Sequence, residues 1–132
     1  MIGLDTNVIV RYIAQDDAVQ SAKATKLIES LSPETPGFIA LIAVAEFVWV
    51  ARSCYRASDE AIANMIETLL RTKDLIIERA ELVWQALRHF QSSPGANFAD
   101  YLIERCGHAE GCKYTATFDR SAAKAAGMKN IG

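Results

Sequence analysis

Hydrophobic and polar positions follow two different periods along this chain. Short apolar runs, such as residues 2–5, are typical of buried strands. Longer segments carry apolar residues at spacings of three and four, which is typical of helices with one buried face. Residues 57–72 are the clearest case, and Ser58 occupies the N-cap position of this expected helix. Its apolar face comprises Ile62, Met65, Ile66, Leu69 and Leu70.

The same patterns divide the whole chain into alternating strands and helices. Turn-forming residues at 32–37 and 92–96 separate neighbouring elements. Strands are expected at residues 2–5, 38–41, 74–78, 112–119 and 128–131. Helices are expected at residues 8–13, 18–31 (with Ala22, Leu27, Ile28 and Leu31 on one side), 42–55, 57–72, 80–92 and 97–111, with a short one after Asp119. Because strands separated by helices pair in parallel through right-handed crossovers, this order predicts an α/β fold with helices on both faces of the sheet.

Composition narrows the class of protein. The 132 residues are enough for one domain with a substantial core, and 51% of them are hydrophobic. No interdomain linker is visible, so we expect a single domain over 1–132. The net charge of −2 excludes a chain that is basic throughout, so any contact with nucleic acid needs a local basic patch.

The sequence also bears on location and on structural metals. The longest apolar run, 38–51, is interrupted by Glu46 and is shorter than the ~20 residues of a membrane span. No signal peptide is expected, and an odd count of three cysteines favours a reducing, cytoplasmic setting. Cys106, His108 and Cys112 lie close in sequence, but their spacing does not match a zinc site, so we expect ordinary structural roles for them.

Two carboxylates follow expected strands. Asp5 comes directly after the first strand, and Asp119 ends the segment YTATFD. Ligand sites of parallel α/β folds lie at the carboxyl ends of strands, so both residues are candidates for a shared site. The alternative for each is a helix N-cap, because an aspartate accepts hydrogen bonds from the free N–H groups of a helix start.

Two further carboxylates lie on expected helices. Glu46 is surrounded by apolar residues, which predicts a buried charge that needs a cation, a distant arginine or a route to water. Asp100 falls in the first turn of a helix capped by Asn97, where the helix dipole should keep it ionised. Four clustered carboxylates repel one another unless divalent cations lie between them, and hard oxygen ligands select Mg²⁺ or Mn²⁺.

The chain resembles the PIN-domain nucleases, and more narrowly the VapC-type toxins of bacterial toxin–antitoxin pairs. Four segments carry the resemblance in order: GLDTNVIVRY, FIALIAVAEFVWV, NFADYLI and TFDRSAAK. The resemblance implies a three-layer α/β/α sandwich with a central, mostly parallel sheet. It also implies metal-binding and catalytic roles for Asp5, Glu46, Asp100 and Asp119, with polar support from Thr6, Asn7, Asn97 and Thr117.

Two positions depart from the family pattern. Relatives often carry an aspartate where this chain has Asn97, and its loss is expected to weaken a second metal position. Relatives also often carry a serine near the end of the second strand, where this chain has Ala40. That change removes a hydroxyl but no metal ligand.

The resemblance further implies a mechanism and partners. A metal-activated water would attack an RNA phosphodiester. Arg11 and Arg120 would contact phosphates, unless they are ordinary exposed arginines. A VapB-type antitoxin would cover an apolar groove and the acidic site, and a homodimer is expected. Tyr12, Phe47 and Trp49 are candidates for that groove, although core positions are the favoured expectation for all three.

Three alternatives stay open at this point. A PIN-like binding module that has lost catalysis is compatible with Asn97, and a housekeeping RNA-processing nuclease would use the same chemistry. A phospho-accepting signalling domain also places acids at strand ends. That class needs an acid next to Asp5 and a lysine after the last strand, and the chain has neither feature.

Overall fold

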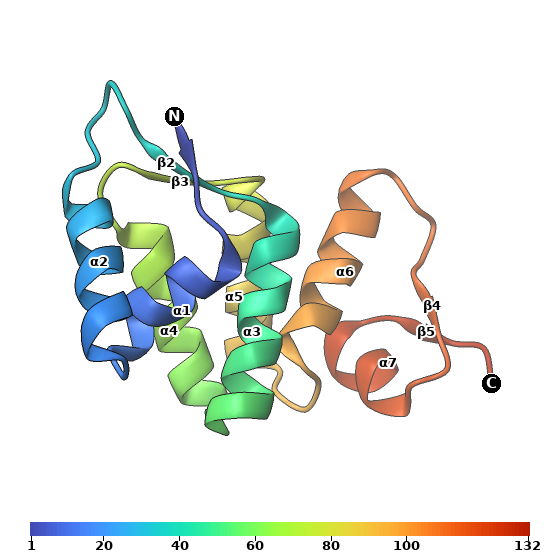
Figure 1. Ribbon diagram of the computed structural model, residues 1–132. Coiled ribbons are helices and arrows are strands. Elements are labelled where there is room, and N and C mark those ends of the chain that lie inside the picture. Colours follow the sequence, from blue (N-terminus) through green and yellow to red (C-terminus); the bar gives the residue numbers. More distant parts are fainter. The chain divides into compact units, whose positions relative to one another are not determined.

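The computed structural model describes residues 1–132 as two compact units, unit 1 from Met1 to Ala80 and unit 2 from Glu81 to Gly132 (Figure 1). Each unit has its own buried apolar residues and its own strand pairs. The single domain expected from the length and composition stays a prediction.

Unit 1 contains a three-stranded parallel sheet with strand order β1-β2-β3. Gly3 pairs with Phe38, which pairs with Ile76. Helix α1 packs against both α2 and α3, and α4 packs against β3. The elements are β1 (Ile2–Gly3), α1 (Thr6–Ala14), α2 (Ala18–Glu29), β2 (Gly37–Ile39), α3 (Leu41–Tyr55), α4 (Asp59–Arg71) and β3 (Leu75–Ile77).

The sheet of unit 1 is packed tightly against apolar side chains. Ile39 and Ile77 are buried, whereas Ile76, which points to the opposite face, is partly exposed. A Cβ at Gly37 would lie 2.8 Å from Cδ1 of Leu31 and 3.0 Å from Cδ1 of Leu75. A glycine therefore lets β2 lie close to these two leucine side chains.

Unit 2 is held together by an aromatic cluster. Phe90 meets the rings of Phe98 and Tyr101 edge to face, at centroid distances of 5.6 and 5.4 Å. The Tyr101 hydroxyl donates to the carbonyl of Ser93 and ties the loop before α6 to that helix. The elements are α5 (Ala80–Ser92), α6 (Phe98–Ala109), β4 (Ala116–Thr117), α7 (Arg120–Ala126) and β5 (Lys129–Asn130), and β4 pairs with β5 in parallel.

The α/β class with parallel strands is confirmed, and most expected helices agree with the structure to within a few residues. Ser58 caps α4 as predicted, since its Oγ accepts from the N–H of Ala61 at 3.1 Å. Two expectations were wrong. The strand expected at 112–119 has only two residues, because most of that segment forms no strand pairs, and Ala22 is exposed. No helix has the length and apolar character that crossing a membrane requires.

Candidate functional site

A cavity of about 700 Å³ in unit 1, which we call the acidic pocket, is lined by two of the four predicted acidic residues. Asp5 reaches it from the start of α1 and Glu46 from the middle of α3. Thr6, Asn7 and Arg11 line the same pocket. The other lining residues are Val10, Asp16, Val50, Cys54 and Tyr55.

Asp5 combines the two roles that the sequence left open. Its Oδ1 accepts a hydrogen bond from the N–H of Thr6 at 2.7 Å, so it is the N-cap of α1. Its Oδ2 has no hydrogen-bond partner in the chain, and the residue is exposed. Asp5 therefore caps the helix with one oxygen while the other stays available to a ligand in the acidic pocket.

Glu46 is exposed, so the prediction of a buried charge was wrong. Residues around it are apolar, but α3 turns Phe47 and Val48 into the core and leaves Ile42 and Trp49 exposed, at 80% and 66% of their surface. Glu46 lies on that outer face. It forms no ion pair with an arginine, and its carboxylate is therefore open to a ligand.

The three aromatic residues proposed for the groove differ in their exposure. Phe47 is only 2% exposed, as a core residue should be. Trp49, for which a core position was also favoured, is on the surface because it follows Glu46 by three residues on the outer face. Tyr12 is half-buried.

Asp16, which the sequence analysis did not single out, closes one side of the acidic pocket. Its Oδ2 accepts from the Tyr55 hydroxyl at 2.8 Å, and its Oδ1 accepts from Nη1 of Arg11 at 3.2 Å. The Tyr55 hydrogen bond is the main cause of a lowered Asp16 pKa, and Arg11 acts in the same direction. The same hydrogen bond raises the pKa of Tyr55. Asp16 is therefore already partnered and holds Arg11 at the edge of the pocket.

No sequence pattern could have found this network. Asp16 and Tyr55 are 39 residues apart, and the spacing between them carries no periodic signal. The neighbouring Asp17 has the locally readable role, because it caps α2 through the N–H groups of Val19 and Gln20.

Asp100 lies in the first turn of α6 in unit 2 and is half-buried. Burial raises its pKa, the hydrogen bond that Oδ2 accepts from the N–H of Asn97 at 3.1 Å lowers it, and the charge of Asp119 raises it further. Burial and the charge of Asp119 therefore act against the helix dipole at this position. The two carboxylates are close enough to repel each other.

Asp119 is the N-cap of α7. Its Oδ1 accepts from the N–H groups of Ser121 at 2.7 Å and Ala122 at 3.2 Å. Its own N–H donates to Oγ1 of Thr117 at 3.0 Å, so Thr117 fixes the backbone that carries the carboxylate. Arg120 follows directly and is exposed.

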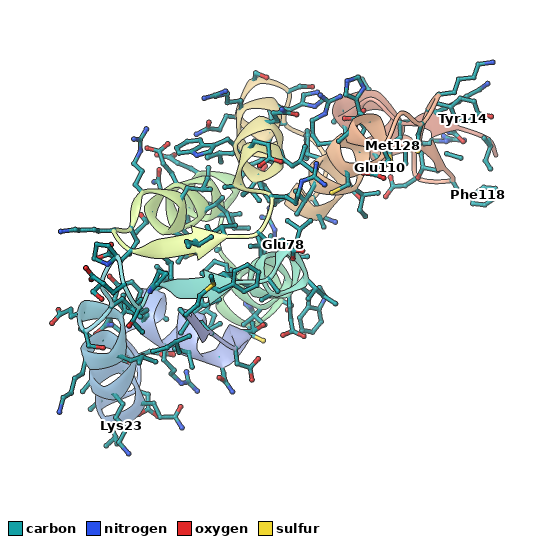
Figure 2. All side chains as sticks on the ribbon, turned by 90° about the horizontal axis from the view of Figure 1, so that it is seen from above. Lys23, Glu78, Glu110, Tyr114, Phe118 and Met128 are labelled. Atoms are coloured by element: carbon teal, nitrogen blue, oxygen red, sulfur yellow. The ribbon has the colours of Figure 1, made fainter.

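Glu78 is a second residue that the sequence analysis missed. Figure 2 labels Glu78 among the side chains of the protein. Ala40, the N-cap residue of α3, has no side-chain oxygen, and Oε1 of Glu78 accepts from the N–H of Leu41 at 2.8 Å instead. The backbone N–H of Glu78 also donates to the carbonyl of Ile39 at 2.9 Å. A carboxylate at the end of β3 thus supplies the cap that the missing serine would give to the helix carrying Glu46.

The carboxylates form two pairs, Asp5 with Glu46 and Asp100 with Asp119. No group of three or more His, Cys, Asp or Glu side chains is arranged as a metal site. The donor chemistry nevertheless fits Mg²⁺ or Mn²⁺, because all four side chains offer hard oxygen ligands. A cation beside Asp100 and Asp119 would also relieve the repulsion between them.

Comparison with known proteins identifies the family. No curated protein matches the chain. The family model of the PIN domain matches residues 2–128. PIN domains are generally metal-dependent nucleases that act on nucleic acids. The match runs from the first strand to just beyond α7 and covers nearly the whole chain, so the chain belongs to the PIN domain family.

Proposed function

We propose that this protein is a Mg²⁺- or Mn²⁺-dependent endoribonuclease that acts as a VapC-type toxin. PIN domains are generally nucleases, which supports the catalytic part of the proposal, and the four segments described above support the narrower assignment. The observation that carries the proposal is the acidic pocket, where Asp5 and Glu46 have free carboxylate oxygens on one cavity.

In this proposal Asp5, Glu46, Asp100 and Asp119 are the metal-binding and catalytic residues. A divalent ion held by these carboxylates would supply a water of lowered pKa and would neutralise charge on the phosphate. Thr6 and Asn7 support Asp5, while Asn97 and Thr117 support Asp100 and Asp119 through the hydrogen bonds described above. Arg11 and Arg120 contact RNA phosphates.

An apolar groove supports the antitoxin part of the proposal. A cavity of about 330 Å³ is lined by Val10 and Ile13 of α1, Val50 of α3 and Met65 of α4. It shares Val10, Val50, Asp16 and Tyr55 with the acidic pocket. A VapB-type segment would place apolar side chains in the groove and an arginine or lysine in the acidic pocket, where opposite charges attract.

A homodimer and a cytoplasmic location complete the proposal and rest on the resemblance alone. A housekeeping RNA-processing nuclease is the nearest alternative. It would use the same carboxylates but would not arrest growth when expressed alone, so a growth measurement separates the two.

The first experiment maps newly formed RNA 5′ ends in cells after induction of the chain. Asp100→Asn removes the carboxylate charge and keeps an oxygen for the Asn97 hydrogen bond. Glu110→Gln, an exposed change at the other end of α6, is the matched control. Discrete ends with the unchanged chain and the control, but not with Asp100→Asn, would support the nuclease.

Two other outcomes would change the proposal. Identical end maps in all three cultures, with soluble protein in each, would favour the binding module that has lost catalysis. Discrete RNA 5′ ends that depend on Asp100 but are not accompanied by growth arrest would support the ribonuclease and contradict the toxin role.

A further inference from the structure

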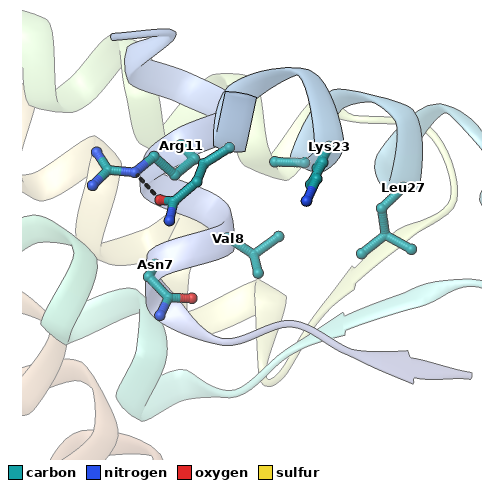
Figure 3. A pocket seen from close by; sticks show the side chains of 7 residues that line it. Asn7, Val8, Arg11, Lys23 and Leu27 are labelled. Carbon is teal, nitrogen blue, oxygen red and sulfur yellow. Dashed lines mark hydrogen bonds between the residues drawn. The ribbon is translucent and has the colours of Figure 1, made fainter. Parts of the chain in front are cut away.

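Another cavity of unit 1 lies between α1 and α2, and we call it the α1–α2 pocket (Figure 3). It measures about 260 Å³. Lys23 and Leu27 project from the side of α2 that faces the pocket, and Val8 of α1 lines the same pocket (Figure 3). The remaining lining residues are Asn7, Arg11, Gln20 and Ala24. We propose that this pocket is a subsite for one nucleotide of the RNA substrate next to the cleaved phosphate, with Lys23 contacting a phosphate.

The two pockets are continuous along α1. Asn7 and Arg11 line both of them, and these residues are four positions apart on one stripe of the helix. Asn7 is also only two positions from Asp5. A chain that leaves the acidic pocket along α1 therefore enters the α1–α2 pocket. This inference rests on the proposed function, because it extends the path of the same substrate.

Charge separates the two pockets. The acidic pocket has Asp5, Asp16 and Glu46 in its lining, whereas no acidic side chain lines the α1–α2 pocket. Arg11 is engaged by Asp16 and donates from Nε to Oε1 of Gln20 at 2.7 Å. Lys23 is exposed and forms no ion pair. The free positive charge at this position complements a phosphate, while the acidic pocket complements a cation.

The size and walls of the pocket favour a single nucleotide. Its volume is below the roughly 300–1,000 Å³ of pockets that enclose drug-sized ligands, so it does not hold a long segment. Val8, Ala24 and Leu27 give it an apolar side for a sugar or a base. No aromatic ring lines it, so stacking is not available there. Affinity should therefore come mainly from the phosphate contact and depend on salt.

The test compares Lys23→Gln with Lys26→Gln in the full-length protein. Lys26 belongs to the same helix and is exposed, but it does not line the pocket. Binding of single-stranded RNA oligonucleotides, taken from a cleaved sequence where cleavage is found and of mixed sequence otherwise, is measured over a range of salt concentrations. Lys23→Gln should weaken binding several-fold and reduce the salt slope by about 0.7, the value for one phosphate contact in single-stranded nucleic acid. Lys26→Gln should change neither quantity, and Lys23→Arg should retain binding.

Shortening the oligonucleotide one nucleotide at a time locates the contact. One truncation should weaken binding to the unchanged chain as much as Lys23→Gln does, and should have little further effect on that variant. Equal binding by the Lys23→Gln and Lys26→Gln variants would overturn the subsite. So would a Lys23→Gln variant that binds RNA normally and loses affinity for an acidic peptide, because the pocket would then serve a protein partner.

The binding measurement also separates this inference from the proposed function. If the unchanged chain cleaves no RNA with Mg²⁺ or Mn²⁺ but binding still depends on Lys23, the nuclease proposal fails and the RNA contact stands. If the chain cleaves RNA and the Lys23 and Lys26 variants have the same KM, the nuclease stands and the subsite fails.

Discussion

The two acidic pairs are held in different ways. In unit 1, Asp5 and Glu46 are exposed on a common cavity, and each has at least one carboxylate oxygen without a partner. In unit 2, Asp100 is half-buried and repelled by Asp119, whose Oδ1 accepts two hydrogen bonds at the start of α7. The pair in unit 1 is thus open to a ligand at little structural cost, whereas the pair in unit 2 also determines local stability.

This difference shows that a carboxylate available to a ligand can also stabilise or destabilise the fold, depending on its surroundings. A carboxylate that caps a helix stabilises it through hydrogen bonds to free N–H groups. A carboxylate that is partly buried beside a second one destabilises the empty protein. The following predictions separate these contributions.

The largest expected effect is on RNA cleavage. Asp5→Asn and Asp100→Asn should each reduce the rate by at least about 100-fold, since even residues that only orient metal ligands contribute about 10–100-fold. If both pairs serve one metal-dependent step, the double variant should be no slower than the slower single variant. The rates are measured with purified protein and a short RNA.

Multiplied effects in the double variant would contradict a shared step. They would mean that the pair in unit 1 and the pair in unit 2 act independently. Chelation with EDTA should abolish cleavage by the unchanged chain, and activity that persists in EDTA would contradict the metal dependence.

The next effect concerns stability and should distinguish the pairs. Asp119→Ala removes the cap of α7 and should lower the free energy of unfolding by about 1 kcal/mol. Glu46→Gln should change it by less than about 0.5 kcal/mol, because Glu46 is exposed and unpaired. Urea unfolding of both variants measures the difference, and Asp119→Asn, which can still cap, is the control.

The cap that Glu78 provides to α3 should contribute a similar or smaller amount to the free energy of unfolding. Glu78→Ala should destabilise the protein by up to about 1 kcal/mol, because the N–H of Leu41 loses its side-chain acceptor. Adding Ala40→Ser should restore most of the loss by placing an acceptor at the N-cap position. A Glu78→Ala variant as stable as the unchanged chain would show that the Glu78 hydrogen bond contributes nothing.

The smallest effect is the pH dependence of Asp100. Its pKa is raised above the ordinary 3.8, so its contribution to stability is fully present below that value and is lost as the pH rises through the folded-state pKa. At pH 7 in EDTA, Asp100→Asn should therefore raise Tm slightly, and the gain should vanish at a pH below 3.8. Added Mg²⁺ should stabilise the unchanged chain more than the variant. A lower Tm for the variant at pH 7 would contradict the role of burial.

Local features were predictable from the sequence to different extents. The helix at 80–92 and the Ser58 cap agree with the structure because a helix and its start depend on neighbouring residues. The strand at 112–119 was overextended because strand length depends on a pairing partner, and only Ala116 and Thr117 have one. Glu46 was misplaced because apolar neighbours in sequence do not determine which side of α3 faces the core.

The sequence by itself determined the α/β class and the order of the elements. It also placed Asp5 and Asp119 at helix starts, since caps are local. Only the tertiary structure decided that Glu46 is open to a ligand, that Asp16 pairs with Tyr55 across 39 residues and that Glu78 caps α3 across 37. The physical reason is that burial, repulsion and hydrogen bonding depend on distances in space, and residues far apart in the chain become neighbours only after it folds.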